Sequence, residues 1–267
     1  MRGRSVRTVL LGIDLGTTAV KVGLFDAATG EQVALARREY STVSPAPGWV
    51  EMDAEVYWRA TVAATREALA AAGQPQVLAL GLSSQGQTFV PLDADYRPLC
   101  SAIVWLDTRA ERETEELRAA HDLDEYRRRT LHAFPSAIDS ASKILWLRRH
   151  EPDIWARTRS LTLLPDYLGL RLTGERRLDI NNAASTALVD QTTGDWWDEG
   201  LSTVGVDRAG RSPIVAPGEP IGALTAQAAE ELGLPQGILV AAGSNDQLNG
   251  AVGVGNVRPG IASGTVG

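Results

Sequence analysis

The 267-residue sequence is poor in cysteine and histidine. Because Cys100 is its only cysteine, no intrachain disulfide can form, and this favours a reducing, cytoplasmic environment. The three histidines, His121, His132 and His150, lie in charged, helix-like segments without the spacing of metal ligands. We therefore interpret them as surface residues and expect neither a disulfide scaffold nor a histidine-based metal centre.

The sequence also lacks basic blocks and long apolar runs. Its formal net charge is −7, so we expect no nucleic-acid partner. The first apolar run meets Asp14 too early to be a signal-peptide core or a membrane span, so we expect no membrane association. The patterns of a P-loop and of a Gly-x-Ser-x-Gly elbow are both missing. A composition of 44% hydrophobic and 22% charged residues is typical of a globular domain.

The order of apolar segments predicts an α/β protein with a mixed central sheet. Three short runs at the start, joined by turns, predict an antiparallel β-meander, and Asp53 then caps a long helix that ends before Gly73. The expected strands span 9–13, 19–25, 32–38, 77–83, 88–92, 161–164 and 237–242, and the expected helices span 54–72, 108–119, 123–129, 140–149, 165–174 and 223–232.

The stretch GIDLGTTAVKVGLFD near the N-terminus places a Gly-Thr-Thr turn between two strand-like runs. Gly16 lets the backbone approach a phosphate closely, while adjacent amides and the hydroxyls of Thr17 and Thr18 supply donors. Asp14 lies at the end of a strand, where its carboxylate could hold Mg²⁺, and Lys21 could reach a terminal phosphate. A plain hairpin turn with a surface aspartate is the alternative.

A second aspartate, Asp246, lies in the segment SNDQLNG, in a Gly-bounded loop that follows a buried strand and opens a helix. It either caps that helix or serves as a catalytic base. Its pairing with Asp14 favours the base, because open α/β sheets bind ligands just beyond the carboxyl ends of their strands. One carboxylate would then serve a metal and the other a substrate hydroxyl.

A third group of polar and aromatic side chains occurs in two segments, GLSSQGQTFVPLD and IVWLDTRAE. Carbohydrate sites need this mixture, because amides and carboxylates bind hydroxyls while an aromatic face covers C–H groups. The alternative for the second segment is that Asp107 caps the next helix and Arg109 is solvated. The candidate sugar-facing residues are Gln85, Gln87, Trp105, Asp107 and Arg109.

Taken in order, these segments resemble the FGGY carbohydrate kinases, and most closely their xylulokinase-like branch. The resemblance covers nearly the whole chain and rests on GIDLGTTAVKV, GLSSQGQ, AIVWLDTRAE, SASKILWLRRHEP, LLPDYLGLRLTGE and AGSNDQLNGAVGVG. It implies an actin/ribonuclease-H-like fold in which ATP and a sugar bind between two domains. It also implies a cytoplasmic, Mg²⁺-dependent phosphotransferase that acts on an alcohol group.

The resemblance further implies roles for individual residues. Asp246 would be the general base that draws the proton from the sugar hydroxyl, which then attacks the γ-phosphate of ATP. Asp14 would lie at the Mg²⁺–ATP end of the cleft. The phosphate-facing residues would be Gly16, Thr17, Thr18 and Lys21 in the first loop and Gly264 and Thr265 in a second, and the sugar-facing residues would be Gln87, Trp105, Asp107 and Gln247.

Two departures from the family pattern limit these implications. Xylulokinases carry Met-His and glycerol kinases Arg-Glu where this chain has Gly86-Gln87, so the substrate stays open among xylulose, other ketoses and polyols. The chain also stops inside the expected second phosphate hairpin. We therefore expect residues 1–260 to form the N-terminal, sugar-binding domain and residues 261–267 to begin the second phosphate loop, with the C-terminal ATP-binding domain absent from this chain.

These expectations leave three functions open. The first is a carbohydrate kinase domain that has little activity alone and whose exposed interdomain surface favours a homodimer. The second is a non-catalytic sugar-binding module of the same fold. The third is an actin-like ATPase that acts on protein, which sugar-independent ATP hydrolysis would reveal.

Overall fold

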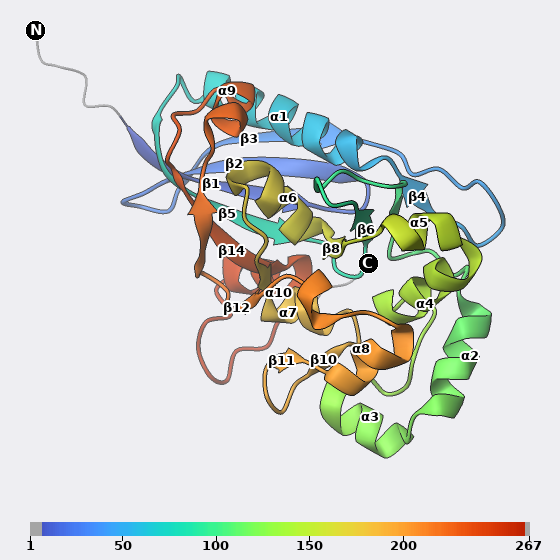
Figure 1. The fold of residues 1–267 in the computed structure, drawn as a ribbon. Helices are drawn as coiled ribbons and strands as arrows, with labels where there is room; N and C mark the ends of the chain where they lie inside the picture. The colour runs from blue at the N-terminus through green and yellow to red at the C-terminus, as the bar shows by residue number, and fades with distance from the viewer. Residues whose placement is uncertain (1–6, 265–267) are drawn as a thin grey trace, which may run out of the picture.

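The computed structural model describes residues 7–264 (Figure 1). Its strands are β1 (Thr8–Leu15), β2 (Ala19–Asp26), β3 (Gln32–Glu39), β4 (Glu51–Met52), β5 (Gln76–Ser84), β6 (Phe89–Leu92), β7 (Ala102–Ile103), β8 (Ser160–Leu163), β9 (Leu178–Asp179), β10 (Val189–Asp190), β11 (Asp195–Trp196), β12 (Ile214–Val215), β13 (Pro220–Ala223) and β14 (Leu239–Asn245). Its helices are α1 (Ala54–Ala71), α2 (Glu111–Ala120), α3 (Leu123–Thr130), α4 (Ser140–His150), α5 (Pro152–Arg157), α6 (Leu164–Thr173), α7 (Ile180–Ala184), α8 (Asp198–Val204), α9 (Ala226–Leu232) and α10 (Asp246–Gly253), and a 3₁₀ turn spans Arg208–Gly210. No helix within residues 7–264 combines the length and apolarity that crossing a bilayer requires.

The central sheet contains six strands in the order β13-β14-β5-β1-β2-β3. Strands β1, β2 and β3 form the predicted antiparallel meander, whereas β5 pairs in parallel with both β1 and β14. The prediction of an α/β fold with a mixed sheet is therefore confirmed. Because β1, β5 and β14 run in the same direction, their carboxyl ends meet at one edge of the sheet.

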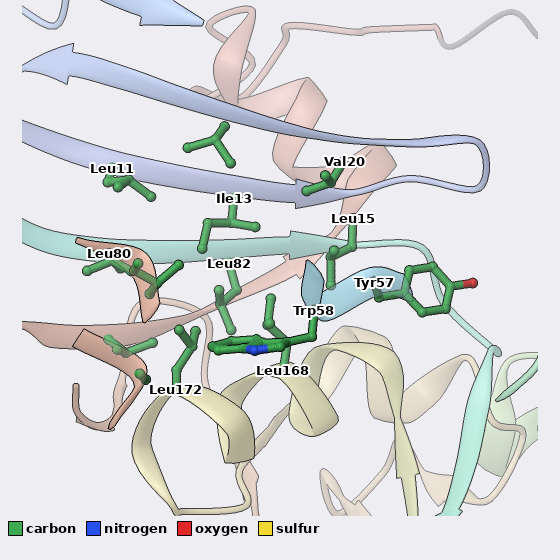
Figure 2. Packing of buried hydrophobic residues seen from close by; sticks show 14 of the residues in the cluster. Leu11, Ile13, Leu15, Val20, Tyr57, Trp58, Leu80, Leu82, Leu168 and Leu172 are labelled. Atoms are coloured by element: carbon green, nitrogen blue, oxygen red, sulfur yellow. The ribbon is translucent and has the colours of Figure 1, made fainter. Parts of the chain in front are cut away.

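One face of this sheet is buried against helices α1, α6 and α9. Alternate residues of β1, such as Leu11 and Ile13, are almost fully buried. Figure 2 shows them in one cluster with Trp58 of α1 and Leu168 of α6. Burying each side chain of this kind contributes about 1.5–3 kcal/mol to stability. The alternation leaves Asp14 on the opposite face of β1, which is partly open to solvent.

A second hydrophobic core joins the smaller sheet, of order β4-β7-β6-β8, to the helices of the middle segment. Leu145 and Leu147 of α4 pack there with Leu117 of α2. This layer carries the candidate sugar-facing segments, because β6 begins just after Gln87 and β7 leads into Trp105. The two cores therefore place the sugar-facing candidates beside the carboxyl edge of the central sheet.

Two expected boundaries near the C-terminal end are wrong. The helix expected over 223–232 begins only at Ala226, because residues 220–223 pair as β13 with β14. The hydroxyl of Thr225 caps this helix by accepting a hydrogen bond from the amide of Ala228 (3.2 Å). The loop expected from residue 243 is instead the end of β14, which continues to Asn245 before α10 begins.

The expected surface position of the histidines is wrong for His132. Its side chain is only 24% exposed, and its ring lies against the carbonyl of Ala184 at the end of α7. His150 is exposed as expected and pairs with Glu113. The charged composition around His132 gave no signal for its burial, because the buried face of α7 is distant in sequence.

Candidate functional site

A row of polar residues crosses the sheet close to its carboxyl edge. In the strand register Asp14 lies opposite Ser83 of β5 on one side and Lys21 of β2 on the other. Ser83 lies in turn opposite Ser244 of β14, and Lys21 lies opposite Arg37 of β3. Residues paired in register point to the same face of a sheet. The row therefore gathers hydroxyl, carboxylate and cationic groups from five strands on the face opposite the core.

Asp14 lies at the centre of this row. Its Oδ1 accepts a hydrogen bond from the Ser83 hydroxyl (2.9 Å), and its Oδ2 lies 3.4 Å from Lys21 Nζ. An open cleft of about 550 Å³ lies over these groups. It is lined by Asp14, Gly16, Thr17, Thr18, Ala19, Lys21, Arg37, Asp246, Gln247 and Gly250. The structure thus brings the first-loop candidates together with Asp246 and Gln247 from the far end of the chain.

Asp246 begins α10 but is not its cap. The cap is Asn245, whose side-chain oxygen accepts a hydrogen bond from the amide of Gln247 (3.1 Å). Burial raises the pKa of Asp246 above its usual value, and the nearby Asp14 carboxylate raises this pKa too. The Gln247 amide and Lys21 lower the pKa, but their effect is smaller than the combined increase. A carboxylate with a raised pKa is a better proton acceptor, which suits a general base.

Asp14 fits a metal ion that arrives with a nucleotide better than a resident ion. Residues 7–264 contain no group of three His, Cys, Asp or Glu side chains placed to hold a metal. Mg²⁺ commonly takes one or two protein carboxylates and completes its shell with phosphate oxygens and water. The Asp14 side chain is 32% exposed and faces the cleft, so it can supply one such ligand.

Three side chains from distant segments hold the Gly-Thr-Thr turn in place. The carbonyl of Gly16 accepts hydrogen bonds from the Tyr40 hydroxyl (2.7 Å) and from Gln85 Nε2 (3.0 Å). The indole Nε1 of Trp105 donates to Thr17 Oγ1 (2.8 Å). Because the Thr17 oxygen is the acceptor in this contact, its own proton remains available to a ligand in the cleft.

Replacing Trp105 with phenylalanine is expected to loosen this turn. The substitution removes one hydrogen bond, worth about 1 kcal/mol, so local opening should become about fivefold more frequent. Hydrogen exchange of the Gly16 amide, which donates to the carbonyl of Ala19 (3.0 Å), measures this opening. Trp155→Phe, which lies away from the turn, is the matched control, and equal exchange in both variants would contradict the bracing role of Trp105.

The alternative reading of Asp107 and Arg109 is wrong. Helix α2 begins only at Glu111 and has no side-chain cap. The Arg109 side chain is 3% exposed and lies over the ring of Trp49, 3.7 Å from its centroid. Asp107 is fully buried and accepts hydrogen bonds from Arg109 through both oxygens. The pair stiffens the segment that carries Trp105, and a contact between Asp107 and a sugar stays a prediction.

Lys143 is a buried cation that the motif analysis did not single out. Its Nζ donates to the carbonyls of Val104 (3.2 Å) and Trp105 (3.3 Å). Burial lowers its pKa to about 7, against the opposing effect of the carboxylates of Asp107 and Asp139. The available signal was a lone lysine inside the apolar helix segment SASKILWL.

Arg37 is the other cleft residue that sequence reasoning missed. It lies on β3 opposite Lys21 and lines the cleft. The sequence indication was the alternation of residues along the third strand, which places Arg37 on the same face as Leu35. Pairing of β3 with β2 had to be known before this alternation could point to the cleft.

Two further predicted residues, Gln87 and Gly264, do not line the cleft. Gln87 follows β5 and is held by contacts to α4 and α7. Gly264 is exposed near the end of the described chain and is not among the residues that line the cleft. Thr265 lies outside the described residues. The second phosphate loop therefore stays a prediction.

A hollow of similar size, about 560 Å³, lies on another part of the surface, between α5 and the turn Arg208–Gly210. Its lining includes Trp155, Arg159 and Asp207 but none of the predicted site residues. With a single carboxylate it lacks the pairing of acid and base groups that phosphoryl transfer needs. The cleft over Asp14 is therefore the candidate functional site.

Comparison with known proteins shows which family the chain belongs to. Residues 9–253 match the family described as "FGGY family of carbohydrate kinases, N-terminal domain". The chain is 36% identical to the xylulose kinase of Escherichia coli (strain K12), over 92% of this chain and 50% of that protein. It is 32% identical to the autoinducer-2 kinase of Yersinia enterocolitica, over 94% of this chain and 48% of that protein.

The fold is also similar to solved structures of this group. A crystal structure described as a "xyloylose kinase" from Brucella ovis superposes with a TM-score of 0.88 at 35% identity, over 94% of this chain and 51% of that chain. The chain thus spans about half the length of the relatives it matches.

Proposed function

Because this chain belongs to the FGGY family of carbohydrate kinases, we propose that it is the sugar-binding half of an enzyme that transfers the γ-phosphoryl group of ATP to a small sugar or polyol. In this proposal residues 1–260 form the N-terminal domain and residues 261–267 begin the second phosphate loop. The observation that supports it most directly is the cleft that Asp14, Lys21 and Asp246 share.

The residues of the cleft have different roles in the proposed reaction. Asp246 accepts the proton of the sugar hydroxyl while the oxygen of that hydroxyl attacks the γ-phosphorus. A positioned base of this kind increases the reaction rate by about 10²–10⁴-fold. Lys21 and Arg37 place positive charge beside the phosphates, where negative charge spreads in the transition state. Thr17 and Thr18 offer hydroxyl donors from the turn. Asp14 would hold the Mg²⁺ that binds together with ATP, and the ion would neutralise part of the phosphate charge.

The substrate class we propose is a ketopentose such as xylulose. Relatives named xylulose kinase and autoinducer-2 kinase are 36% and 32% identical to this chain over the half of their length that it matches. Trp105 supplies an aromatic face and Gln87 supplies an amide, the two kinds of group that bind the C–H and O–H faces of a sugar. Gln87 cannot titrate near neutral pH, in contrast to the histidine of xylulokinases.

The proposal predicts that one class of sugar stabilises this chain against heat. A ligand that binds only the folded state adds about 2.7 kcal/mol at a concentration of one hundred times its Kd. The measurement is a thermal-shift panel of ketopentoses, ketohexoses, aldoses and polyols, with and without Mg²⁺–ATP. A longer protein that contains this chain should then convert ATP to ADP only with the stabilising sugar, which becomes phosphorylated. Sugar-independent hydrolysis would instead support an actin-like ATPase.

A further inference from the structure

Gln87 is held in an unusual conformation by two helices. Its φ of +63° lies in the left-handed region, which is uncommon for a residue with a side chain. Its backbone N–H donates to Ser185 Oγ after α7 (3.2 Å), and its carbonyl accepts from Ser140 Oγ of α4 (3.0 Å). Such strain persists where surrounding contacts hold a residue for a task. The two contacts therefore fix where the Gln87 side chain begins.

The side chain of Gln87 is oriented by a buried carboxylate. Its Nε2 lies 3.4 Å from Asp139 Oδ1, and the Asp139 side chain is only 3% exposed. An ionised carboxylate can only accept hydrogen bonds, so the NH₂ end of the amide must face it. With Nε2 turned to Asp139, the carbonyl oxygen Oε1 is the end of the amide left for another donor, and no residue within 7–264 donates a hydrogen bond to it.

His132 completes the arrangement on the other side of Asp139. Its Nδ1 lies 3.3 Å from Asp139 Oδ1, and its Nε2 lies 3.2 Å from the carbonyl oxygen of Ala184. Both partners are acceptors, so both ring nitrogens donate only when the imidazole is protonated. Burial lowers the pKa of His132. The contacts with Asp139 and the Ala184 carbonyl raise this pKa by more than burial lowers it, so the pKa lies above its usual value.

We propose that the His132–Asp139 ion pair is a positioning device that holds the Gln87 carboxamide with its oxygen free to accept a hydroxyl proton from the substrate. The inference rests on the proposed function. It predicts selectivity for sugars that present a hydroxyl at this point over deoxy analogues, because a site built to bind a hydroxyl loses a buried hydrogen bond when that group is missing.

The charged groups around this pair come from each element that packs against it. Lys143 of α4 and Tyr126 of α3 both face Asp139. The three arginines at the end of α3 pair with Asp124, Glu125 and Asp190. Helix α7 contributes only the Ala184 carbonyl. His132 and Lys143 are therefore the groups near Asp139 that titrate around neutral pH, and the experiment must separate them.

The test is a pH titration of this chain by NMR. In the wild type the His132 ring should titrate above the usual histidine pKa of about 6.5, and the side-chain NH₂ signals of Gln87 should shift with the same midpoint. In His132→Gln that step should vanish, whereas a step caused by Lys143 would remain. His150→Gln is the matched control and should leave the Gln87 titration unchanged.

Two results would overturn the inference. The first is a wild-type His132 midpoint at or below the usual histidine pKa of about 6.5, a measurement that requires no variant to fold. The second is an identical Gln87 titration in His132→Gln. The proposed coupling would then be absent even if the chain binds a sugar.

Sugar affinity tests the consequence for recognition. In the wild type it should fall as the pH rises through the His132 pKa, because the ion pair is complete only below that value. His132→Gln should bind the stabilising sugar about tenfold more weakly at pH 6. Unchanged affinity would contradict a role in recognition while the proposed function stands. Failure of the wild type to bind any sugar would contradict the proposed function, and the NMR titration would still decide the positioning role.

Discussion

Asp246→Asn is expected to lower phosphoryl transfer by about 10²–10⁴-fold, in a longer protein that contains this chain, while sugar affinity changes only a few-fold. The amide has nearly the shape of the carboxylate but cannot take the proton of the attacking hydroxyl. The measurement is kcat with saturating sugar and Mg²⁺–ATP, together with sugar affinity by calorimetry. Near-normal turnover would contradict the assignment of Asp246 as the base.

The pH dependence of turnover should carry the signature of a raised pKa. Asp246 accepts a proton only when it is ionised, so kcat should fall as the pH drops through its pKa. Because burial and the Asp14 carboxylate raise that pKa, the fall should begin at a higher pH than for an ordinary aspartate, whose pKa is about 3.9. Lys21→Met removes a nearby positive charge that lowers this pKa, and should move the acid limb to still higher pH.

Asp246 should also lower the stability of the folded protein at neutral pH. A carboxyl group whose pKa is higher in the folded state binds protons more tightly there, so its contribution to stability falls as pH rises through the folded pKa. At neutral pH the folded state therefore carries an unfavourable charge beside Asp14. Asp246→Asn should raise the Tm at pH 7, and this gain should shrink towards acidic pH. A lower Tm would indicate that the substitution damages the structure, and the loss of turnover could then not be assigned to the missing base.

Local patterns explain which parts of the site could be predicted from sequence. The Gly-Thr-Thr turn, Asp14 and Lys21 lie within one hairpin, so the alternation of its strands places them on one face without further knowledge. Asp246 needed one additional premise, namely that the carboxyl ends of parallel strands meet. The pairing of β14 and β1 on either side of β5 supplies that premise.

The residues that could not be predicted depend on contacts between distant segments. Arg37 reaches the cleft only through the pairing of β3 with β2. A solvated Arg109 stayed open as an alternative because nothing in its own segment reveals that Trp49 covers it. His132 meets Asp139 across the loop between α3 and α4, and no periodicity encodes that contact. Such positions are set by packing, which a single sequence describes poorly.

Gly243→Ala is expected to lower the free energy of unfolding by about 3 kcal/mol. An added Cβ at this position would lie 1.4 Å from the backbone carbonyl oxygen of Leu82, far inside any tolerated contact. A side-chain end could rotate away, but a strand carbonyl cannot, so β14 and β5 must separate where the register shifts between Ala241 and Ser244. Urea unfolding of this chain measures the loss.

Gly81→Ala is the matched control for this prediction, because it lies on β5 in the same sheet and its added Cβ would meet no heavy atom within 4 Å. Its unfolding free energy should stay within about 0.5 kcal/mol of the wild type. Equal stability of the two variants would contradict the close approach at Gly243.

Because Asp246 follows Gly243 by three residues, any shift that relieves the clash also moves the proposed base. A misplacement of about 1 Å can cost about 10²-fold in rate, so Gly243→Ala should impair turnover even at temperatures where the protein remains folded.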